Sequence, residues 1–252
     1  QGICLDGLQG KHEGFLLKVL GVGNKYRLAV LGSDKRGTAY GLMTLVRMMG
    51  VSPWQWWADC EPTPREVFQL EADFERLEVP SVAYRGIFIN DEDWGLNPWS
   101  SNNYEPKMRQ RNGEDSTPRN GEIGPYTHER IFELLLRLRA NIFWPAMHEC
   151  TVPFYLIKGN REVADKYGIL ISTSHCEPMM RNTNGEWRKA GLGDYNFVTN
   201  AKQVVHFWEE RVKELSGSDC LYTLGMRGVH DSAMEGAKTI PEQVKVLTDV
   251  LK

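Results

Sequence analysis

Ionisable side chains gather at four places along the sequence, each directly after a short apolar run. The clusters cover residues 90–94 (Asn-Asp-Glu-Asp-Trp), 148–150 (His-Glu-Cys), 175–177 (His-Cys-Glu) and 227–231 (Arg-Gly-Val-His-Asp). The apolar runs before them have the length and composition of buried strands. Because the carboxyl ends of parallel strands meet on one face of an α/β barrel, four such clusters in register predict one shared site.

Carboxylates dominate these clusters, and their chemistry fits hydrolysis of a glycosidic bond. That reaction needs two carboxyl groups, one acting as an acid and the other as a base or nucleophile. Neighbouring imidazoles can hydrogen-bond to sugar hydroxyls, and a guanidinium such as Arg227 or Arg181 can hold an anionic group of the substrate. An aromatic ring such as Trp94 can provide a stacking surface for a sugar.

Two alternatives to glycoside hydrolysis remain open from the residues alone. One is metal-assisted hydrolysis, with a divalent metal held by side chains from the set His148, Glu149, His175, Cys176, His230 and Asp231. No H-x-H or H-E-x-x-H spacing supports it. The other is a carbohydrate-binding module without catalysis. A cysteine nucleophile has less support, because adjacency to a histidine in sequence is not the required geometry.

From about residue 80 the sequence alternates between strand and helix patterns. Alternation of this kind implies parallel strands joined by helical crossovers. No G-x-G-x-x-G follows a strand, so a dinucleotide-binding sheet has no support. The predicted fold is α/β, with the first four β/α units of a (β/α)8 TIM-type barrel. Strands are predicted over 84–90, 141–147, 169–174 and 221–226, and helices over 127–139, 161–167, 201–215 and from the capping box at Thr239 onward.

The first part of the sequence has a different pattern from the barrel part. A strand is predicted over 26–31 and a helix over 36–49, which indicates the C-terminal part of a small α+β domain over residues 1–78. The half-barrel then occupies residues 79–252. Within it, the polar stretch 100–124 predicts a long loop, which is either a lid over the site or an inert mobile insertion.

Composition and charge exclude several classes of protein. Of the 252 residues, 41% are hydrophobic and 25% are charged, as in ordinary globular proteins. The formal net charge is −3 and no stripe of Lys and Arg is present, which argues against a nucleic-acid partner. The apolar runs are far shorter than a membrane span. The five cysteines are scattered, so no disulfide framework is expected.

The motifs at the strand ends resemble those of glycoside hydrolase family 115, the xylan α-1,2-glucuronidases. Four runs carry the resemblance in the order of the family: YRGIFINDEDWG at 84–95, WPAMHEC at 144–150, TSHCEPM at 173–179 and LGMRGVHD at 224–231. The run GSDKRGTAYG at 32–41 resembles the start of a helix in the accessory domain that precedes the barrel in such enzymes. The resemblance covers nearly the whole chain.

The resemblance implies removal of (4-O-methyl-)glucuronic acid α-1,2-linked to xylose in glucuronoxylan, with inversion and without a metal or organic cofactor. It implies that Asp91 is catalytic, that His148 contacts the substrate, and that Trp54 places an aromatic ring near the pocket. The second catalytic carboxylate is expected beyond Lys252, with Glu149 as the candidate inside this sequence. Position at the strand ends predicts further substrate contacts from Glu92, Asp93, Trp94, His175, Glu177, Arg227, His230 and Asp231.

Half a barrel would leave open sheet edges and an uncovered core. We therefore expect this sequence to be an internal piece of a longer enzyme and to be inactive by itself. The expected partners are glucuronoxylan or its oligosaccharides, with no nucleic acid and no membrane, and with a homodimer as one assembly of the parent. The polymeric substrate predicts an extracellular or periplasmic location, although the sequence has no signal peptide.

Overall fold

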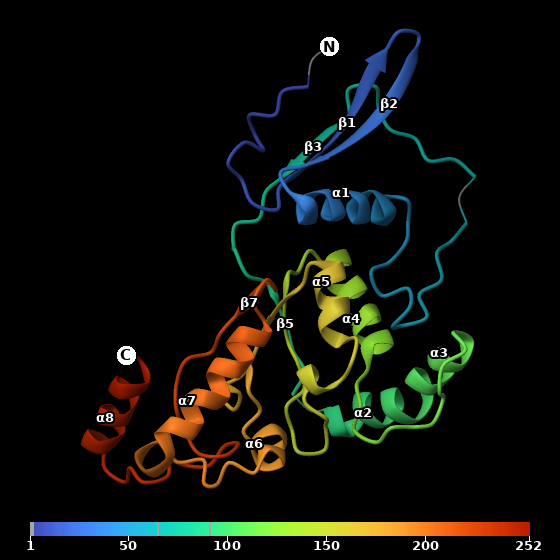
Figure 1. The fold of residues 1–252 in the computed structure, drawn as a ribbon. Coiled ribbons are helices and arrows are strands. Elements are labelled where there is room, and N and C mark those ends of the chain that lie inside the picture. The colour runs from blue at the N-terminus through green and yellow to red at the C-terminus, as the bar shows by residue number, and fades with distance from the viewer. Residues whose placement is uncertain (1–2, 65, 91) are drawn as a thin grey trace. The chain divides into compact units, whose positions relative to one another are not determined.

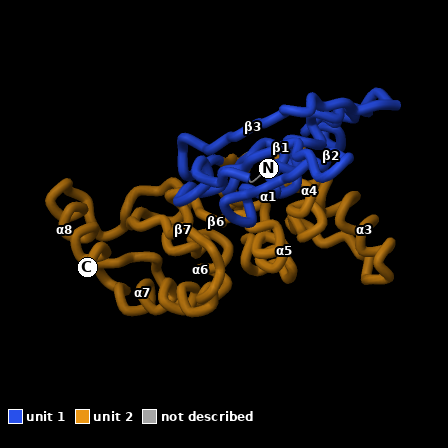
Figure 2. The backbone as a smooth tube through the Cα atoms, turned by 90° about the horizontal axis from the view of Figure 1, so that it is seen from above, with its two compact units in different colours: residues 1–85, 132–141 blue, residues 86–131, 142–252 orange. Residues whose placement is uncertain are grey.

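The computed structural model describes residues 3–64, 66–90 and 92–252 (Figure 1). The chain divides into two compact units, coloured separately in Figure 2. The units are defined by contacts between residues and do not test the predicted domain boundary between residues 78 and 79, which stays a prediction. Unit 1 comprises residues 1–85 and 132–141, and unit 2 comprises residues 86–131 and 142–252.

Unit 1 contains an antiparallel sheet and one long helix. The strand order is β2-β1-β3, with β1 at Phe15–Val22, β2 at Lys25–Gly32 and β3 at Glu75–Glu78. Helix α1 (Lys35–Met48) follows β2, and the Asp34 side chain caps it by accepting a hydrogen bond from the Gly37 amide at 2.8 Å. The predicted strand and helix of this region are therefore confirmed, while β1 was not predicted.

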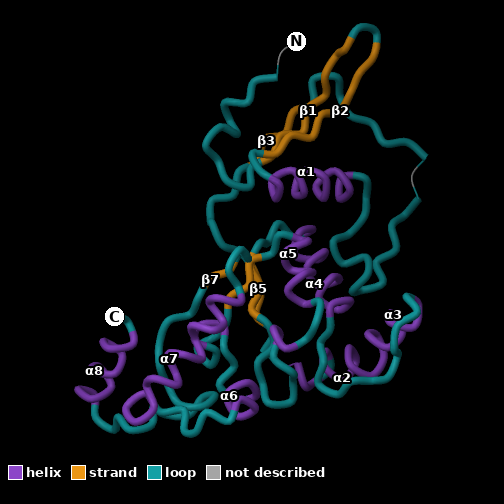
Figure 3. Tube along the Cα trace, in the orientation of Figure 1, coloured by secondary structure: helices purple, strands orange, loops and turns teal. Residues whose placement is uncertain are grey.

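Unit 2 is built on a parallel sheet, as the alternating pattern predicted. Its described strands are β4 (Gly86–Phe88), β5 (Ile142–Trp144), β6 (Leu170–Ser172) and β7 (Cys220–Leu221), in the order β4-β5-β6-β7. Figure 3 colours the strands orange and labels β5 and β7 of this sheet. Each strand pairs with the next one along the chain. All four predicted strands are present, although each is shorter than its apolar run. The mixed α/β class with a parallel sheet is confirmed.

Helices connect these strands, and their ends follow local capping chemistry. Gly168, at φ 63°, ends α5 in the left-handed conformation, and Thr239 begins α8 with the predicted capping box. Helix α7 begins earlier than predicted, because Asn196 accepts hydrogen bonds from the amides of the first turn. No helix in the described part of the chain has the length and apolarity to cross a bilayer. The helices are α4 (Pro125–Arg137), α5 (Asn160–Tyr167), α6 (Gly185–Ala190), α7 (Phe197–Glu214) and α8 (Ile240–Val250).

The predicted loop over 100–124 is wrong for its first half. Helix α2 (Leu96–Trp99), a π-helical turn (Ser100–Tyr104) and helix α3 (Glu105–Arg111) follow one another there. The polar residues that suggested a solvated loop are buried at the start of α4. Ser100 Oγ lies 2.8 Å from Thr127 Oγ1, and Glu105 Oε1 accepts hydrogen bonds from the Thr127 amide and hydroxyl at 2.6 and 2.7 Å.

Gly86 makes the first contact of the parallel sheet, and we expect its replacement by alanine to destabilise the protein. A Cβ atom there would lie 1.8 Å from the carbonyl oxygen of Ile142, its partner in the β4–β5 register. Because backbone atoms of the paired strand cannot move without disturbing the sheet, Gly86→Ala should lower the free energy of unfolding by about 1–3 kcal/mol or more. Gly95→Ala is the matched control, since a Cβ there meets open space. Equal urea midpoints for the two variants would contradict the predicted clash.

Candidate active site

Contacts between side chains connect the ends of all four parallel strands. Glu92 follows β4, and its Oε2 lies 3.3 Å from Nδ1 of His148, which follows β5. The His148 ring lies 5.5 Å from the ring of His230, which follows β7. His175 follows β6, and its Nε2 lies 2.8 Å from Oδ1 of Asp231, which follows β7. The strand ends therefore form one cluster, as the parallel topology predicted.

Asp231 is the centre of this cluster on the β6–β7 side. Besides His175, its carboxylate lies 3.2 Å from an amino nitrogen of Arg227 and 3.4 Å from Nδ1 of His230. The hydrogen bond from His175, together with the charges of His230 and Arg227, holds the pKa of Asp231 below its usual range. Asp231 therefore stays ionised and gathers three nitrogen-bearing side chains around one negative charge.

Arg227 is held in place but keeps one free donor. Its second amino nitrogen donates to the backbone oxygen of Asp231 at 2.8 Å, which fixes the direction of the guanidinium. Its Nε is buried and has no hydrogen-bond partner among the described residues. A buried donor of this kind is costly unless a ligand satisfies it. The binding of an anionic substrate group by Arg227 stays a prediction.

Arg181, the other guanidinium proposed from the sequence, is engaged inside unit 2 instead. It lies 2.8 Å from Glu186, stacks over the Phe207 ring at 4.3 Å, and is largely buried. The fully buried Arg211 pairs with the same carboxylate at 2.7 Å. This buried ion cluster fixes α6 and α7, so Arg181 has no free face for a substrate.

Glu92 is buried rather than exposed to a substrate. Its Oε1 accepts hydrogen bonds from the His148 amide and from Thr151 Oγ1, both at 3.0 Å. Its side chain has no exposed surface. The structure therefore directs Glu92 toward the 148–151 loop, and its contact with the substrate stays a prediction.

Glu177 is a second buried carboxyl group in the cluster. Its Oε1 accepts a hydrogen bond from Asn182 Nδ2 at 2.9 Å, and its Oε2 has no hydrogen-bond partner in the described part of the chain. Burial raises the pKa of the Glu177 carboxyl to about 8, and the carboxylates of Glu186 and Glu92 shift it in the same direction. Glu177 is therefore protonated at neutral pH and can act as a hydrogen-bond donor.

We expect the Glu177 carboxyl to make stability fall as the pH rises toward 8. The folded protein keeps this proton up to about pH 8, whereas an exposed carboxyl with the reference pKa of 4.5 has already lost it. Because the folded state then binds more protons than the unfolded state, the free energy of unfolding decreases across this window. His128, whose pKa burial lowers to about 4, acts in the opposite direction only below pH 6.5.

Urea unfolding at pH 6.5 and pH 8 isolates the contribution of Glu177. In Glu177→Gln, which imitates the protonated side chain, the pH-dependent loss should be smaller than in the wild type by about 1–2 kcal/mol. Equal pH dependence of the two proteins would show that the carboxyl is ionised throughout this range.

Cys176 completes a group that could hold a metal ion. One ligand atom from each of His175, Cys176 and Asp231 lies within 4.8 Å of the others. However, Arg227 already lies 3.2 Å from the same Asp231 oxygen and competes with a cation for it. Burial, reinforced by the charge of Asp231, raises the pKa of the Cys176 thiol to about 11. A protonated thiol is a poor ligand and a poor nucleophile.

Other predicted residues have no contact with this cluster that the structure resolves, or lie elsewhere. Glu149 is exposed and lies 2.7 Å from Arg188 on α6. Trp94 is 84% exposed after β4, so its ring is free to stack on a sugar, and Asp93 beside it is also exposed. Trp54 belongs to unit 1 and is 47% exposed. Asp91, the predicted catalytic residue, lies outside the described residues.

Sequence reasoning missed three polar residues that support the cluster. Thr151 donates to Glu92, Asn182 donates to Glu177, and Thr183 Oγ1 accepts a hydrogen bond from the His230 amide at 3.1 Å. They stand in loops without a spacing motif, so no sequence signal could have identified them. His230 itself has a φ of 53°, an uncommon conformation for histidine that the Thr183 contact helps to hold.

A cavity of about 510 Å³ opens beside these residues in unit 2. It is lined by Thr183, Trp187 and Val229 and by the ion pair of Glu149 and Arg188, among others. Thr183 links it to the histidine cluster, since its hydroxyl contacts the His230 amide. The volume is in the range of ligand pockets. Glu149 is thus placed in a cavity next to the cluster.

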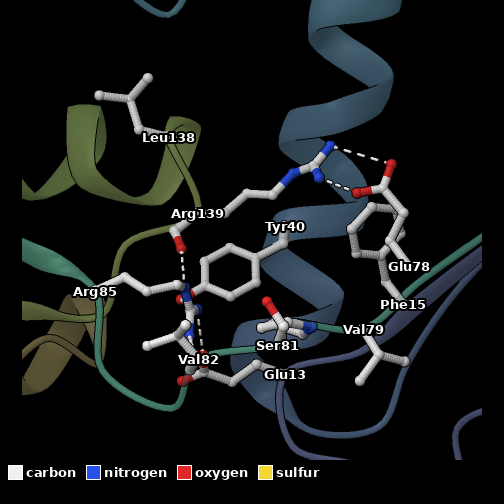
Figure 4. A pocket seen from close by; sticks show the side chains of 11 residues that line it. Glu13, Phe15, Tyr40, Glu78, Val79, Ser81, Val82, Arg85, Leu138 and Arg139 are labelled. Atoms are coloured by element: carbon white, nitrogen blue, oxygen red, sulfur yellow. Dashed lines mark hydrogen bonds and ion pairs between the residues drawn. The ribbon is translucent and has the colours of Figure 1, made fainter.

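A second cavity, of about 380 Å³, lies in unit 1 (Figure 4). Its charged residues are paired with one another, Arg139 with Glu78 and Arg85 with Glu13. Tyr40, at its base, donates a hydrogen bond to the Ala140 carbonyl at 3.0 Å. These paired charges leave little binding capacity, so the strand-end cluster of unit 2 is the stronger candidate site.

Comparisons with known proteins identify the family to which this chain is related. The model of glycosyl hydrolase family 115 matches residues 78–252. Among 18 solved chains that match, one is described as a family GH115 4-O-methyl-α-glucuronidase, BtGH115A, with specificity for decorated arabinogalactans. It shares 56% sequence identity with a TM-score of 0.92, and the match covers 99% of this chain and 31% of that chain. No curated protein matches.

Proposed function

We propose, from the premise that this chain belongs to glycosyl hydrolase family 115, that it carries part of the active site of an α-glucuronidase. The enzyme removes (4-O-methyl-)glucuronic acid from a decorated polysaccharide. The observation that carries the proposal is the single cluster formed by the ends of the four parallel strands, in which Glu92, His148, His175, His230 and Asp231 are linked.

The sheet order supports the more specific proposal of a partial (β/α)8 barrel. In unit 2 each described strand pairs with its successor in sequence, β4-β5-β6-β7. A doubly wound sheet would reverse its order at a switch point, whereas a barrel continues in one direction. Active sites of barrel enzymes lie at the carboxyl ends of the strands, where this cluster lies.

The residues of the cluster can divide recognition and catalysis between them. Arg227 offers a buried free Nε–H to the uronate carboxylate, and His175 and His230 lie beside it around Asp231. Asp91 provides one catalytic carboxyl group. The second comes from Glu149 or from a part of the enzyme outside this sequence. Inversion would require the two carboxyl groups to lie about 6.5–9.5 Å apart, with a water molecule between one of them and the sugar.

Two polysaccharides are candidates for the substrate. The sequence motifs resemble the xylan-active enzymes, which favours glucuronic acid α-1,2-linked to xylose. The 56% identity to an enzyme described with specificity for decorated arabinogalactans favours a galactan backbone. Both share the terminal uronic acid, which is the part that the cluster would bind.

Release of uronic acid by the full-length protein tests this proposal. The protein is incubated with glucuronoxylan and with decorated arabinogalactan, and free glucuronic acid and its 4-O-methyl ether are quantified by chromatography. We expect release from at least one polymer, and proton NMR at early times should show the β-anomer first if the mechanism inverts. Absence of release from both polymers and from their oligosaccharides would contradict the proposal.

The chelator response separates this function from a metal-dependent hydrolase. We expect uronic acid release to be unchanged after exhaustive treatment with EDTA, because Arg227 already neutralises Asp231 in the only metal-ligand group found among the described residues. Loss of activity that stoichiometric zinc or manganese restores would favour the metallohydrolase. Binding to the polymer without any release by the full-length protein would favour a non-catalytic module.

We also propose an extracellular or periplasmic location and a homodimeric parent protein. A polymeric substrate cannot reach an enzyme inside the cytoplasm, so secretion follows from the proposed substrate. Cell fractionation with an activity assay tests the location. Light scattering of the full-length protein after size-exclusion chromatography tests the homodimer.

A further inference from the structure

We infer that Glu92 is a positioning residue that holds the His148 imidazole in one tautomer, with its hydrogen on Nδ1 and its acceptor nitrogen Nε2 free for the substrate. The inference rests on the proposed function. It replaces the direct substrate contact expected of Glu92 with an action through His148. Three features of unit 2 carry it: the burial of Glu92, the way its Oε1 is fixed, and the direction of its Oε2.

The Glu92 carboxylate is fixed in place from one side. It begins the short 3₁₀ turn Glu92–Trp94 after β4, and its side chain is fully buried. Its Oε1 accepts two hydrogen bonds, from the His148 amide and from Thr151 Oγ1, both at 3.0 Å. A carboxylate held by two donors cannot rotate away, so the position of its other oxygen is determined as well.

The second oxygen faces the imidazole. Glu92 Oε2 is buried and lies 3.3 Å from His148 Nδ1, and it forms no hydrogen bond with any of the described residues. This separation is longer than an ideal hydrogen bond, as catalytic contacts often are before the substrate binds. A carboxylate oxygen accepts hydrogen bonds, so its position beside Nδ1 favours the tautomer with hydrogen on Nδ1.

His148 is able to use the nitrogen that remains. Its side chain is 27% exposed, and its ring lies 5.5 Å from that of His230, inside the strand-end cluster. In the tautomer with hydrogen on Nδ1, the ring has one acceptor, Nε2. A sugar hydroxyl or an attacking water is the kind of group that such an acceptor would orient.

The surrounding loop has support that does not depend on Oε2. Asn97 Nδ2 donates to Thr151 Oγ1 at 2.7 Å and to the Cys150 carbonyl at 3.0 Å. Loop packing therefore depends mainly on Oε1, Thr151 and Asn97, whereas Oε2 acts on the imidazole. This division allows a structural role and a positioning role to be tested separately.

Glu92→Gln changes only the atom that faces the ring. The amide oxygen can keep both hydrogen bonds of Oε1, and the amide nitrogen then donates to Nδ1, which forces the ring hydrogen onto Nε2. We expect kcat for uronic acid release by the full-length protein to fall about 10- to 100-fold, with a shifted pH profile and little change in KM. Asn97→Ala, which removes the loop contacts to Thr151 and Cys150 but leaves both donors to Glu92 Oε1, should lower Tm and leave kcat and the pH profile close to those of the wild type.

A double-mutant cycle with His148→Ala shows whether Glu92 acts through this ring. In the His148→Ala background, Glu92→Gln should cost less than about 2-fold in kcat, because its target is already gone. The inference would be overturned if the losses of the two variants simply multiplied, if Glu92→Gln had a wild-type kcat, or if Asn97→Ala lost as much kcat as Glu92→Gln. A wild-type protein that releases no uronic acid would instead refute the proposed function.

Discussion

Asp91→Asn is expected to lower kcat for uronic acid release by the full-length protein by about 10²- to 10⁴-fold. Asparagine keeps the size of the side chain but cannot take up or release a proton, so general acid or base catalysis is lost. The residue lies outside the described part of the structure, and its role is inferred from the motif NDEDW at 90–94.

The control for this substitution is Asp73→Asn, at an exposed aspartate in unit 1. It removes the same charge far along the chain from the strand-end motifs and should keep full activity. Binding of an oligosaccharide to both variants, measured by calorimetry, shows that the loss belongs to the chemical step. A turnover of Asp91→Asn near that of Asp73→Asn would refute the assignment of Asp91 as a catalytic residue.

Asp231→Asn is expected to lower kcat/KM by about 10²-fold or more. The negative charge of Asp231 gathers His175, His230 and Arg227, which lie 2.8, 3.4 and 3.2 Å from its carboxylate oxygens. Without that charge the imidazoles lose their common acceptor and the guanidinium loses one of its two contacts. Loss of a preorganised group at a reacting centre typically costs about 10²- to 10³-fold.

Asp165→Asn is the matched control for this second prediction. Asp165 is also an exposed aspartate with a cationic partner, Arg161, at 3.8 Å, but it lies on α5 and accepts a hydrogen bond from Ser218, which precedes β7. Kinetics with a uronic acid-bearing oligosaccharide compare the two variants. Equal kcat/KM values would mean that the cluster around Asp231 is an ordinary surface ion-pair network.

Much of the fold could be predicted from the sequence, because the spacing of apolar residues and the identity of the capping residues are local signals. The four parallel strands and the helices α1, α4, α5 and α8 follow from them. The strands are shorter than their apolar runs, since a run continues beyond the last paired residue. The helical segment 100–111 was missed because its polar residues suggested a loop. Ser100 and Glu105 are in fact buried, with Thr127 as their partner.

The site was predictable in position but not in the task of each residue. Parallel pairing brings the strand ends together, so the closeness of His148 to His230 and of His175 to Asp231 could be expected. Sequence cannot show which way neighbouring carboxylates turn. Glu92 faces inward to His148, whereas the exposed Glu149 turns to Arg188. That difference depends on side-chain burial, which follows from packing of loops far apart in the sequence.

The structure of the full-length Asp91→Asn protein with a bound uronic acid-bearing oligosaccharide tests the central claim most directly. The claim is that the strand ends of unit 2 form one uronate-binding catalytic cluster. We predict the uronate carboxylate within hydrogen-bond distance of Arg227 Nε, and a hydroxyl of the same sugar at His148 Nε2. A uronic acid bound with none of His148, His175, Arg227 or His230 in contact would contradict the claim.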